Sequence, residues 1–458
     1  MEKKLDLTQG NILSKLLILA LPIMGTAFIQ TAYSMIDMMW IGRLGSDEVA
    51  AVGTAGFFPW LGMAFVMISK IGAEIKVAQS MGEKNFDKVR KFALGAIQIN
   101  LVCAFLYGIV LVFFNKPLIA FFNLGDENII NMAQTYLVVI GLGLVFTFIN
   151  PVFTAIFNGS GESKTPFIMN SIGLVINIIL DPLLIFGYLG FPAMGVLGAA
   201  IATVSSQFIV TLCFIILNIK KKQAYFPMKI LVAPPMEEIK IVGKIGFPVA
   251  IQSGLFTMIS MVIGRIIAEW GPVPIAVQKV GSQIEAISWM TAGGLSTALG
   301  AFVGQNYGAL KYERIEESVK ISIGLAILTG TFASILLIFF GGPIFSLFIT
   351  DEPETLRQGI DYLVILGYSQ IFMCVEITIS GLFNGLGKTK IPALVNSVLS
   401  ALRIPLAYAL SRPEMLGIDG VWWAITITSV FKGVVMSGIY VKMKSSQTLY
   451  ELQYIDKV

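Results

Sequence analysis

Long stretches of apolar residues recur along the whole chain and are separated by short polar segments. In the first half they lie at about residues 15–41, 50–78, 92–114, 131–156, 165–188 and 195–218. In the second half they lie at about residues 239–268, 273–303, 318–340, 359–382, 391–410 and 419–441. Each stretch is long enough for a helix of about 20 residues to cross a bilayer. Because backbone groups in lipid must bond to one another, the pattern predicts an all-α membrane protein with twelve transmembrane helices.

The two halves of the chain carry the same motifs at a constant spacing of 226. At this spacing the segment "FNGSGESKTPFIMNS" at 157–171 aligns without gaps with "FNGLGKTKIPALVNS" at 383–397. The same spacing relates Pro22 to Pro248. After the fifth helix the spacing falls to 222, because the following polar segment is shorter in the second half.

This repeat predicts two six-helix lobes. We expect an N-terminal lobe at 1–218, a cytoplasmic linker at 219–238 and a C-terminal lobe at 239–458. Six is an even number, so both lobes cross the membrane in the same sense. The pseudo-twofold axis between them is then expected along the membrane normal, as in transporters with parallel repeats.

Positive charges fall mainly in alternate polar segments, which fixes the expected orientation. One set of segments includes the lysine- and arginine-rich stretch 84–91 and the three lysines at 220–222. The other set holds only four such residues, Arg43, Lys116, Arg357 and Arg412. The positive-inside rule therefore predicts a multi-pass protein of the cell membrane with both termini cytoplasmic. We interpret the three lysines as an anchor at the inner surface, and we expect a monomer in the lipid bilayer with no nucleic-acid partner.

The composition places most of the chain in lipid and argues against an enzyme. The chain is 56% hydrophobic and 13% charged, whereas soluble domains carry about 25% charged residues. It has no histidine, which excludes His–metal sites and Ser–His dyads. Its three cysteines are far apart in apolar runs, so they form no metal-binding motif: Cys103, Cys213 and Cys374. We expect no cofactor other than a transported ion.

The two halves differ at a few polar positions, and these differences indicate a site in the first half only. Four oxygen-bearing side chains align with three aliphatic residues and one arginine in the second half. The aligned pairs are Asp37 with Ile263, Asn177 with Arg403, Asp181 with Ala407 and, at the spacing of 222, Thr203 with Ile425.

These four side chains are expected at one depth, in the outer half of the first lobe. Asn177 and Asp181 are four residues apart and share a helix face. A carboxylate removed from water holds a proton more readily, and a second carboxylate nearby strengthens this effect. The same oxygens also suit a hard cation such as Na⁺. Asn177 and Thr203 taken alone are equally compatible with hydrogen bonds that join helices, whereas acids inside a membrane are costly and mark ion pathways.

Charged residues in the apolar stretches of the second half form a second candidate group. Arg403 lies deep in its stretch and needs a partner, for which Glu285 and Glu376 are the candidates. Arg403, Lys279 and Lys432 would favour anionic or zwitterionic cargo over purely cationic cargo. Gln252 is one of the two polar residues that closely follow Pro248.

These segments together resemble the MATE (multidrug and toxic compound extrusion) family of transporters. The resemblance is carried by "LPIMGTAFIQTAYSMIDMMWIGRLG" at the start, "INIILDPLLIFG", "GVLGAAIATVSSQ" and, in the second half, "AVQKVGSQIEAISWMTAGGLSTALGAFVGQNYGA". It covers nearly the whole chain. It implies export of small amphipathic, often cationic, organic compounds in exchange for H⁺ or Na⁺.

The resemblance also implies a branch and a site. Asp37, Asn177, Asp181 and Thr203 match the pattern of the DinF-like branch, which includes relatives similar to MepA. NorM-like members carry an acid in helix seven, where this chain has Gln252. Two alternatives remain open at this point. The first is a flippase for lipid-linked precursors; Arg403 favours it, but such relatives usually have more than the twelve spans expected here. The second is a non-transporting membrane receptor, which would give no efflux from vesicles.

Overall fold

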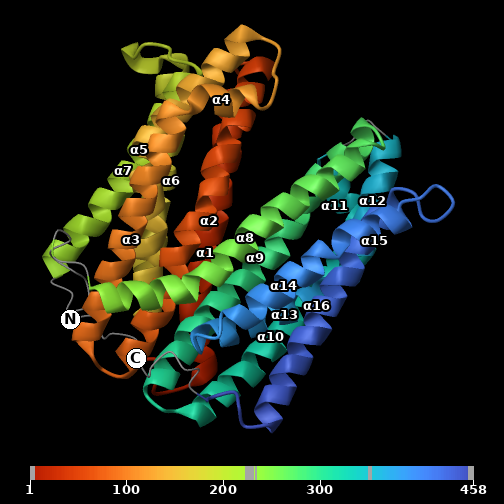
Figure 1. The fold of residues 1–458 in the computed structure, drawn as a ribbon. Coiled ribbons are helices and arrows are strands. Elements are labelled where there is room, and N and C mark those ends of the chain that lie inside the picture. The colour runs from red at the N-terminus through yellow and green to blue at the C-terminus, as the bar shows by residue number, and fades with distance from the viewer. Residues whose placement is uncertain (1–5, 222–231, 233–234, 349–352, 452–458) are drawn as a thin grey trace. The chain divides into compact units, whose positions relative to one another are not determined.

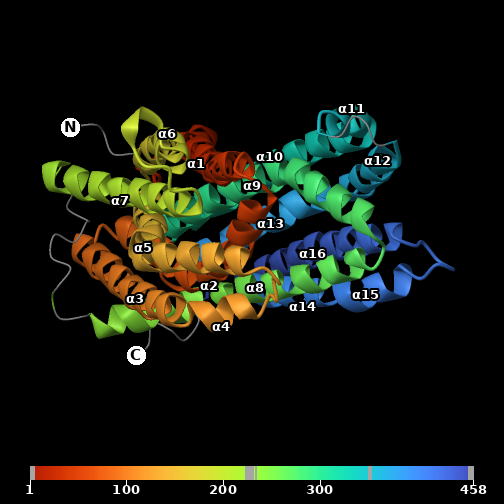
Figure 2. The ribbon, with the colours of Figure 1, turned by 90° about the horizontal axis from the view of Figure 1, so that it is seen from above.

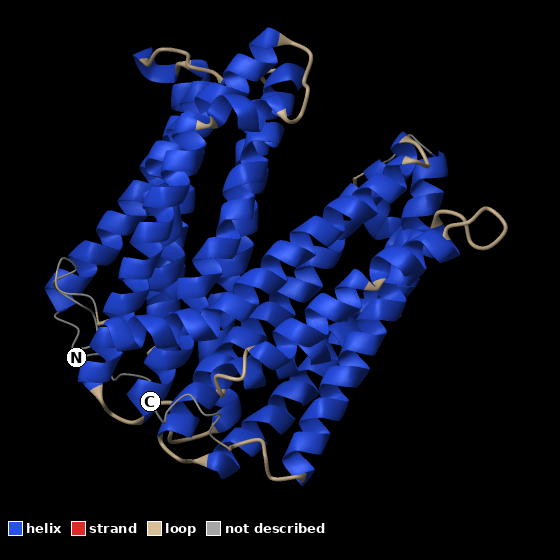
Figure 3. Ribbon diagram, in the orientation of Figure 1, coloured by secondary structure: helices blue, strands red, loops and turns tan. Residues whose placement is uncertain are grey.

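The computed structural model describes residues 6–221, 232, 235–348 and 353–451. Every regular element in these residues is a helix (Figures 1 and 3). Among the described residues, eleven helices are long and apolar enough to cross a membrane, and a twelfth span results if the bent pair α12 (Pro353–Gly367) and α13 (Gln370–Gly385) counts as one. The predicted all-α membrane fold is therefore confirmed. Most of the expected linker at 219–238 and both ends of the chain lie outside the described residues.

The first half forms eight helical elements, of which α4 and η1 are short. They are α1 (Ile12–Gly42), α2 (Ser46–Gly82), α3 (Phe86–Phe113), α4 (Asn115–Ala120), α5 (Glu127–Gly159), α6 (Lys164–Phe186), η1 (Tyr188–Gly190) and α7 (Val196–Lys221). The second half adds, besides α12 and α13, α8 (Met236–Ala268), α9 (Pro272–Gly308), α10 (Tyr312–Phe339), α11 (Gly341–Ser346), α14 (Lys390–Ala401), α15 (Arg403–Leu410) and α16 (Asp419–Ser445).

The helix boundaries repeat with the spacing found in the sequence. The first and last residues of α2, α3 and α4 recur at the spacing of 226 as those of α9, α10 and α11. At the same spacing, the first residue of α5 corresponds to the first residue of α12, and its last residue to the last residue of α13. Equivalent helices of the two halves therefore begin and end at aligned residues, as the repeated sequence motifs indicated.

The chain forms two compact units whose boundaries fall inside helices. Unit 1 contains Gly25–Ala250, and unit 2 contains Asp6–Met24 together with the chain from Ile251 onward. Helices α1 and α8 therefore each belong to both units. The division comes two residues after Pro22 in α1 and two residues after Pro248 in α8. Proline removes one hydrogen bond from a helix interior, so both helices are weakened next to this division.

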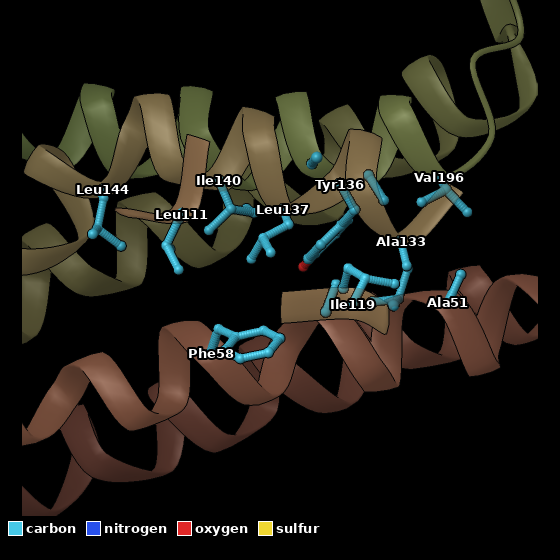
Figure 4. Packing of buried hydrophobic residues seen from close by; sticks show 14 of the residues in the cluster. Ala51, Phe58, Leu111, Ile119, Ala133, Tyr136, Leu137, Ile140, Leu144 and Val196 are labelled. Atoms are coloured by element: carbon cyan, nitrogen blue, oxygen red, sulfur yellow. The ribbon is translucent and has the colours of Figure 1, made fainter. Parts of the chain in front are cut away.

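Unit 1 is built around α5. This helix packs against α2, α3 and α7, and α7 in turn packs against α6 (Figure 2). One apolar cluster includes Phe58 of α2, Leu111 of α3 and Leu137 of α5, and Tyr136 lies within it (Figure 4). These apolar contacts bring α5, α6 and α7 together with α2 and α3 and thereby fix the surroundings of the polar residues of α6.

Unit 2 has an equivalent arrangement, with α13 packed against α9, α10 and α16. The span expected at 359–382 is broken here, because α12 and α13 meet at an angle of 50°. At the break, Leu366 O accepts from the backbone N–H of Ser369 at 3.1 Å and also from two side chains, Ser369 Oγ at 3.0 Å and Gln370 Nε2 at 3.1 Å. Side-chain donors of this kind let a helix break inside a membrane protein without leaving backbone groups unpaired.

The span expected at 391–410 is also divided, by Leu402 between α14 and α15. Pro405 has no backbone N–H, so it cannot bond to the carbonyl of Ala401, the last residue of α14. The side chain of Arg403, at the first position of α15, therefore lies beside a local interruption of the helix.

Candidate functional site

Two of the predicted residues, Asn177 and Asp181, lie on one face of α6 and are buried in unit 1. Both side chains are 0% exposed. Asn177 Nδ2 donates a hydrogen bond to Asp181 Oδ1 at 3.2 Å, as expected for residues one helical turn apart. Because Pro182 follows directly and has no N–H, the helix also lacks one backbone hydrogen bond at this point.

The other two predicted residues, Asp37 of α1 and Thr203 of α7, lie at the same place. Thr203 Oγ1 lies 3.3 Å from Asp37 Oδ2 and 3.0 Å from Ala199 O, so its single hydroxyl proton serves one of these acceptors at a time. The carboxyl group of Asp37 also lies within hydrogen-bonding reach of Asp181 and Asn177. The structure thus brings all four residues together from three helices of one unit.

The group has more hydrogen-bond acceptors than donors. Asp37 Oδ1, Asn177 Oδ1 and Asp181 Oδ2 are buried and have no hydrogen-bond partner among the described residues. Buried carboxylates are costly unless a donor, a proton or a cation meets them. Oxygen atoms of carboxylate, amide and hydroxyl groups are the ligands that a hard cation prefers. The arrangement therefore suits a proton or a small cation such as Na⁺.

Two tyrosines that the sequence comparison did not single out also belong to this place. Tyr33, one turn before Asp37 on α1, has its hydroxyl 3.3 Å from Thr203 O and hydrogen-bonded to Ser206 Oγ. Tyr136 of α5 lies within electrostatic reach of both acids. Tyr33 aligns with Ile259 at the spacing of 226, so the comparison between the halves contained the signal that would have found it.

Close helix packing holds α7 beside α6 at this site. A Cβ atom on Gly198 would lie 2.3 Å from the carbonyl oxygen of Leu184, one turn after Asp181. A Cβ atom on Gly420, its counterpart in unit 2, would lie 2.2 Å from Leu410 O. Small residues allow backbones of membrane helices to approach this closely, and here the approach sets the position of Thr203.

The charged residues predicted in the second half only partly form a network. Arg403 donates through Nε to Thr428 Oγ1 at 2.8 Å and through a terminal nitrogen to Ser429 Oγ at 3.0 Å. Both predicted partners, Glu285 and Glu376, lie within its electrostatic reach. In the described chain, however, its hydrogen bonds go to hydroxyl groups and not to a carboxylate.

The remaining predicted residues lie apart from this network. Lys279 is exposed on α9 and Gln252 is half-buried on α8, and within the described chain neither side chain bonds to Arg403, Glu285 or Glu376. Lys432 of α16 belongs to the network instead, since it lies within electrostatic reach of Arg403 and Glu376. The network is therefore centred on α13, α15 and α16 with Glu285 of α9.

Comparison with known proteins identifies the fold. The chain is 28% identical over 428 residues to a probable multidrug resistance protein NorM of Thermotoga maritima, covering 92% of this chain and 90% of that protein. A solved structure of a MOP superfamily transporter from Pyrococcus furiosus superposes with a TM-score of 0.87 at 22% identity, over 99% of this chain and 100% of the other. An outward-facing structure of a multidrug resistance MATE family transporter gives a TM-score of 0.86 at 22% identity, over 99% and 100% of the two chains.

A family model supports the same assignment and reproduces the internal repeat. The MatE model matches residues 22–183 and again residues 248–409, and the two stretches are related by the same spacing as the aligned motifs. Together they cover more than half of the chain. The chain therefore belongs to the MATE family of multi-pass membrane transporters.

Proposed function

We propose that this protein exports small amphipathic organic compounds from the cell and that the export is driven by entry of H⁺ or Na⁺ at Asp37 and Asp181. The observation that carries the proposal is the pair of acids in unit 1, with three buried acceptor oxygens that have no donor within the described residues. The family membership and the similarity to proteins named as multidrug resistance transporters support export of drugs as the activity.

The location of the acids inside apolar helices supports ion coupling over a purely structural role. Asp181 is fully buried, and among the described residues the neutral donor to its side chain is Asn177 Nδ2. Such a group is expensive to keep ionised away from water. Uptake of a proton or a cation would remove this cost, so the occupied and empty states would differ in stability. A site of this kind couples an ion gradient to a conformational equilibrium.

The mechanism follows from this difference. In the state open to the outside, Asp37 and Asp181 take up the ion and their negative charge is neutralised. Helices α1 and α6 then repack, which weakens the contacts to cargo and releases it outside. In the state open to the cytoplasm the ion leaves and new cargo binds. A membrane potential of 100 mV adds about 2.3 kcal/mol for each elementary charge moved.

The finer assignments belong to the same proposal. We place the chain in the DinF-like branch, because its acids are on α1 and α6 and because α8 has Gln252 where an acid would follow Pro248. We further propose a monomer in the cell membrane, with both termini on the cytoplasmic side and the two repeats related by an axis along the membrane normal. The distribution of lysine and arginine supports this orientation.

Transport in proteoliposomes tests the proposal, with the Na⁺ and H⁺ gradients imposed separately and a panel of fluorescent dyes as cargo. We expect efflux with one gradient and none without a gradient. Asp181→Asn should abolish gradient-driven efflux, because the amide takes up no proton at neutral pH and has no negative charge for a bound cation to neutralise. Asp87→Asn is the matched control, since Asp87 lies on the exposed first turn of α3.

The gradient that drives efflux identifies the coupling ion. Efflux with the Na⁺ gradient alone would assign Na⁺ as the coupling ion, and efflux with the pH gradient alone would assign H⁺. Undiminished gradient-driven efflux by the Asp181→Asn protein would refute the coupling role, provided that the variant remains monodisperse in size-exclusion chromatography.

A further inference from the structure

The repeat places a cation of unit 2 at the position that corresponds to the acidic site of unit 1. Arg403 aligns with Asn177, which bonds to Asp181 in unit 1. The residues that align with the other three members of the acidic site are all aliphatic, namely Ile263, Ala407 and Ile425. The same place in the two repeats therefore carries opposite charge.

Only some of the N–H groups of the Arg403 guanidinium group form hydrogen bonds within the described chain. A guanidinium group has five N–H donors in a planar fork. In the described chain two of them are used, and they go to the neutral hydroxyl groups of Thr428 and Ser429. Arg403 is half-buried, and none of its nitrogen atoms is among the buried atoms that lack a partner. Its Nη1 nitrogen, which has no hydrogen-bond partner in the described chain, therefore keeps some exposed surface.

The neighbouring carboxylates are held by other donors. Glu285 accepts from Gln370 Nε2 at 3.1 Å. Glu376 accepts from Asn396 Nδ2 at 2.8 Å and from Ser380 Oγ at 2.9 Å. These hydrogen bonds keep the two acids within electrostatic reach of Arg403 without a hydrogen bond to it.

Lys432, the other cation of the network, also donates a hydrogen bond to a neutral hydroxyl group. Lys432 donates to Ser400 Oγ at 2.7 Å and lies within electrostatic reach of Arg403 and Glu376. One further cation, Lys432, and two carboxylates, Glu285 and Glu376, thus lie around the guanidinium fork of Arg403. The two carboxylates would repel a doubly charged phosphate, whereas a single carboxylate matches the fork in shape and leaves little excess charge.

We propose that Arg403 forms a carboxylate-binding subsite in unit 2, and that the cargo includes amphipathic compounds bearing a carboxylate group. This inference rests on the proposed export function, because it names the class of compound that is exported. The carboxylate of the cargo bonds to the open edge of the guanidinium fork, while Thr428 and Ser429 hold the other edge in place.

A matched pair of dyes tests the subsite. Tetramethylrhodamine has a free carboxylate, and tetramethylrhodamine methyl ester is the same dye with that group esterified. We expect the purified wild-type protein to bind the free acid at least about tenfold more tightly in fluorescence anisotropy, because hydrogen bonds to a charged group are stronger than neutral ones. The Arg403→Gln protein should bind the two dyes equally. Arg412→Gln, in an exposed loop of the same unit, should keep the wild-type preference.

The Arg403→Lys variant and an independent measurement of efflux complete the test. Arg403→Lys retains the charge but loses the fork, so it should show a reduced preference for the free acid. Equal binding of the two dyes by the wild type overturns the subsite without any variant, and so does a full preference in Arg403→Gln. Efflux is read independently: failure to export either dye, with the binding preference intact, contradicts the proposed export and leaves the subsite standing.

Discussion

At the scale of single residues, the acidic site behaves as one group and not as separate acids. Asp37 and Asp181 come from α1 and α6, yet each lies within reach of the other and of Asn177. Removal of either carboxylate therefore removes part of the same binding site. Groups in direct contact show non-additive effects when they are changed together.

This contact leads to a prediction about ion-induced stability. Binding of the coupling ion at about 100 times its Kd stabilises the wild type by about 2.7 kcal/mol. We expect Asp37→Asn and Asp181→Asn each to lose nearly the whole ion-induced rise in melting temperature, and the double variant to lose no more than either single one. Thermal melting in detergent, with the ion concentration varied, measures this rise.

The ion-induced rise in melting temperature also distinguishes a shared site from two separate ones. Asp87→Asn should retain the ion-induced rise of the wild type. If each single variant kept about half of the rise and only the double variant lost it all, the two acids would bind ions independently and the shared site would be wrong.

The four residues of the site could be predicted because the repeat supplies a comparison within one sequence. Asp37 and Asp181 align with aliphatic residues, so they stood out from the apolar pattern. Tyr136 did not stand out, because it aligns with Tyr362 and looks like a shared core residue. The hydroxyl partners of Arg403 were also missed, since they depend on how α16 packs beside α15, which no spacing in the sequence encodes.

At the scale of helices, close packing between α6 and α7 positions the site. A Cβ atom on Gly198 would lie 2.3 Å from the carbonyl oxygen of Leu184, and rigid backbone cannot move away as a side chain can. We therefore expect Gly198→Ala to destabilise the protein by about 1–3 kcal/mol through overpacking. Gly53 of α2 has open space around its Cβ position, so Gly53→Ala serves as the control.

The measurement is the melting temperature of each purified variant. Gly198→Ala should melt below the wild type, whereas Gly53→Ala should match or exceed it, because alanine has the higher helix propensity. Equal melting temperatures for the two variants would show that α6 and α7 separate easily at this point.

Helix ends and lengths were largely predictable from the apolar pattern, but the break between α12 and α13 was not. In unit 1 the equivalent helix α5 has Gly143 and Leu144, where unit 2 has Ser369 and Gln370. The two polar side chains of unit 2 bond to the carbonyl of Leu366 and so permit the bend. In a hydropathy pattern Ser369 and Gln370 are two polar residues within one apolar span. The pattern does not show that their side chains bond to a backbone carbonyl group.

At the scale of the whole molecule, the charge distribution predicts which loops face the cytoplasm. In a variant without the three native cysteines, Lys84→Cys should react with a membrane-impermeant maleimide only in inside-out vesicles. Lys116→Cys should react in intact cells. Both side chains are exposed, so burial does not limit labelling. The opposite pattern would reverse the proposed orientation, and with it the direction in which the acidic site faces.

The repeat itself was visible in the sequence, and the compact units are a separate property that depends on packing. Aligned motifs gave the spacing of 226, which the helix boundaries and the family model share. The expected lobes at 1–218 and 239–458 followed the loops. The compact units instead divide inside α1 and α8, because packing and not loop position decides which part of a long helix belongs where.

The division of α1 and α8 has a consequence for the continuity of the chain. Each unit takes the opening segment of its own repeat from the other repeat, since Asp6–Met24 belongs to unit 2 and the start of α8 belongs to unit 1. The two repeats are therefore not separable at the loop between them: a chain cut there would divide each compact unit between two fragments, so the units depend on a continuous polypeptide or on fragments that reassociate.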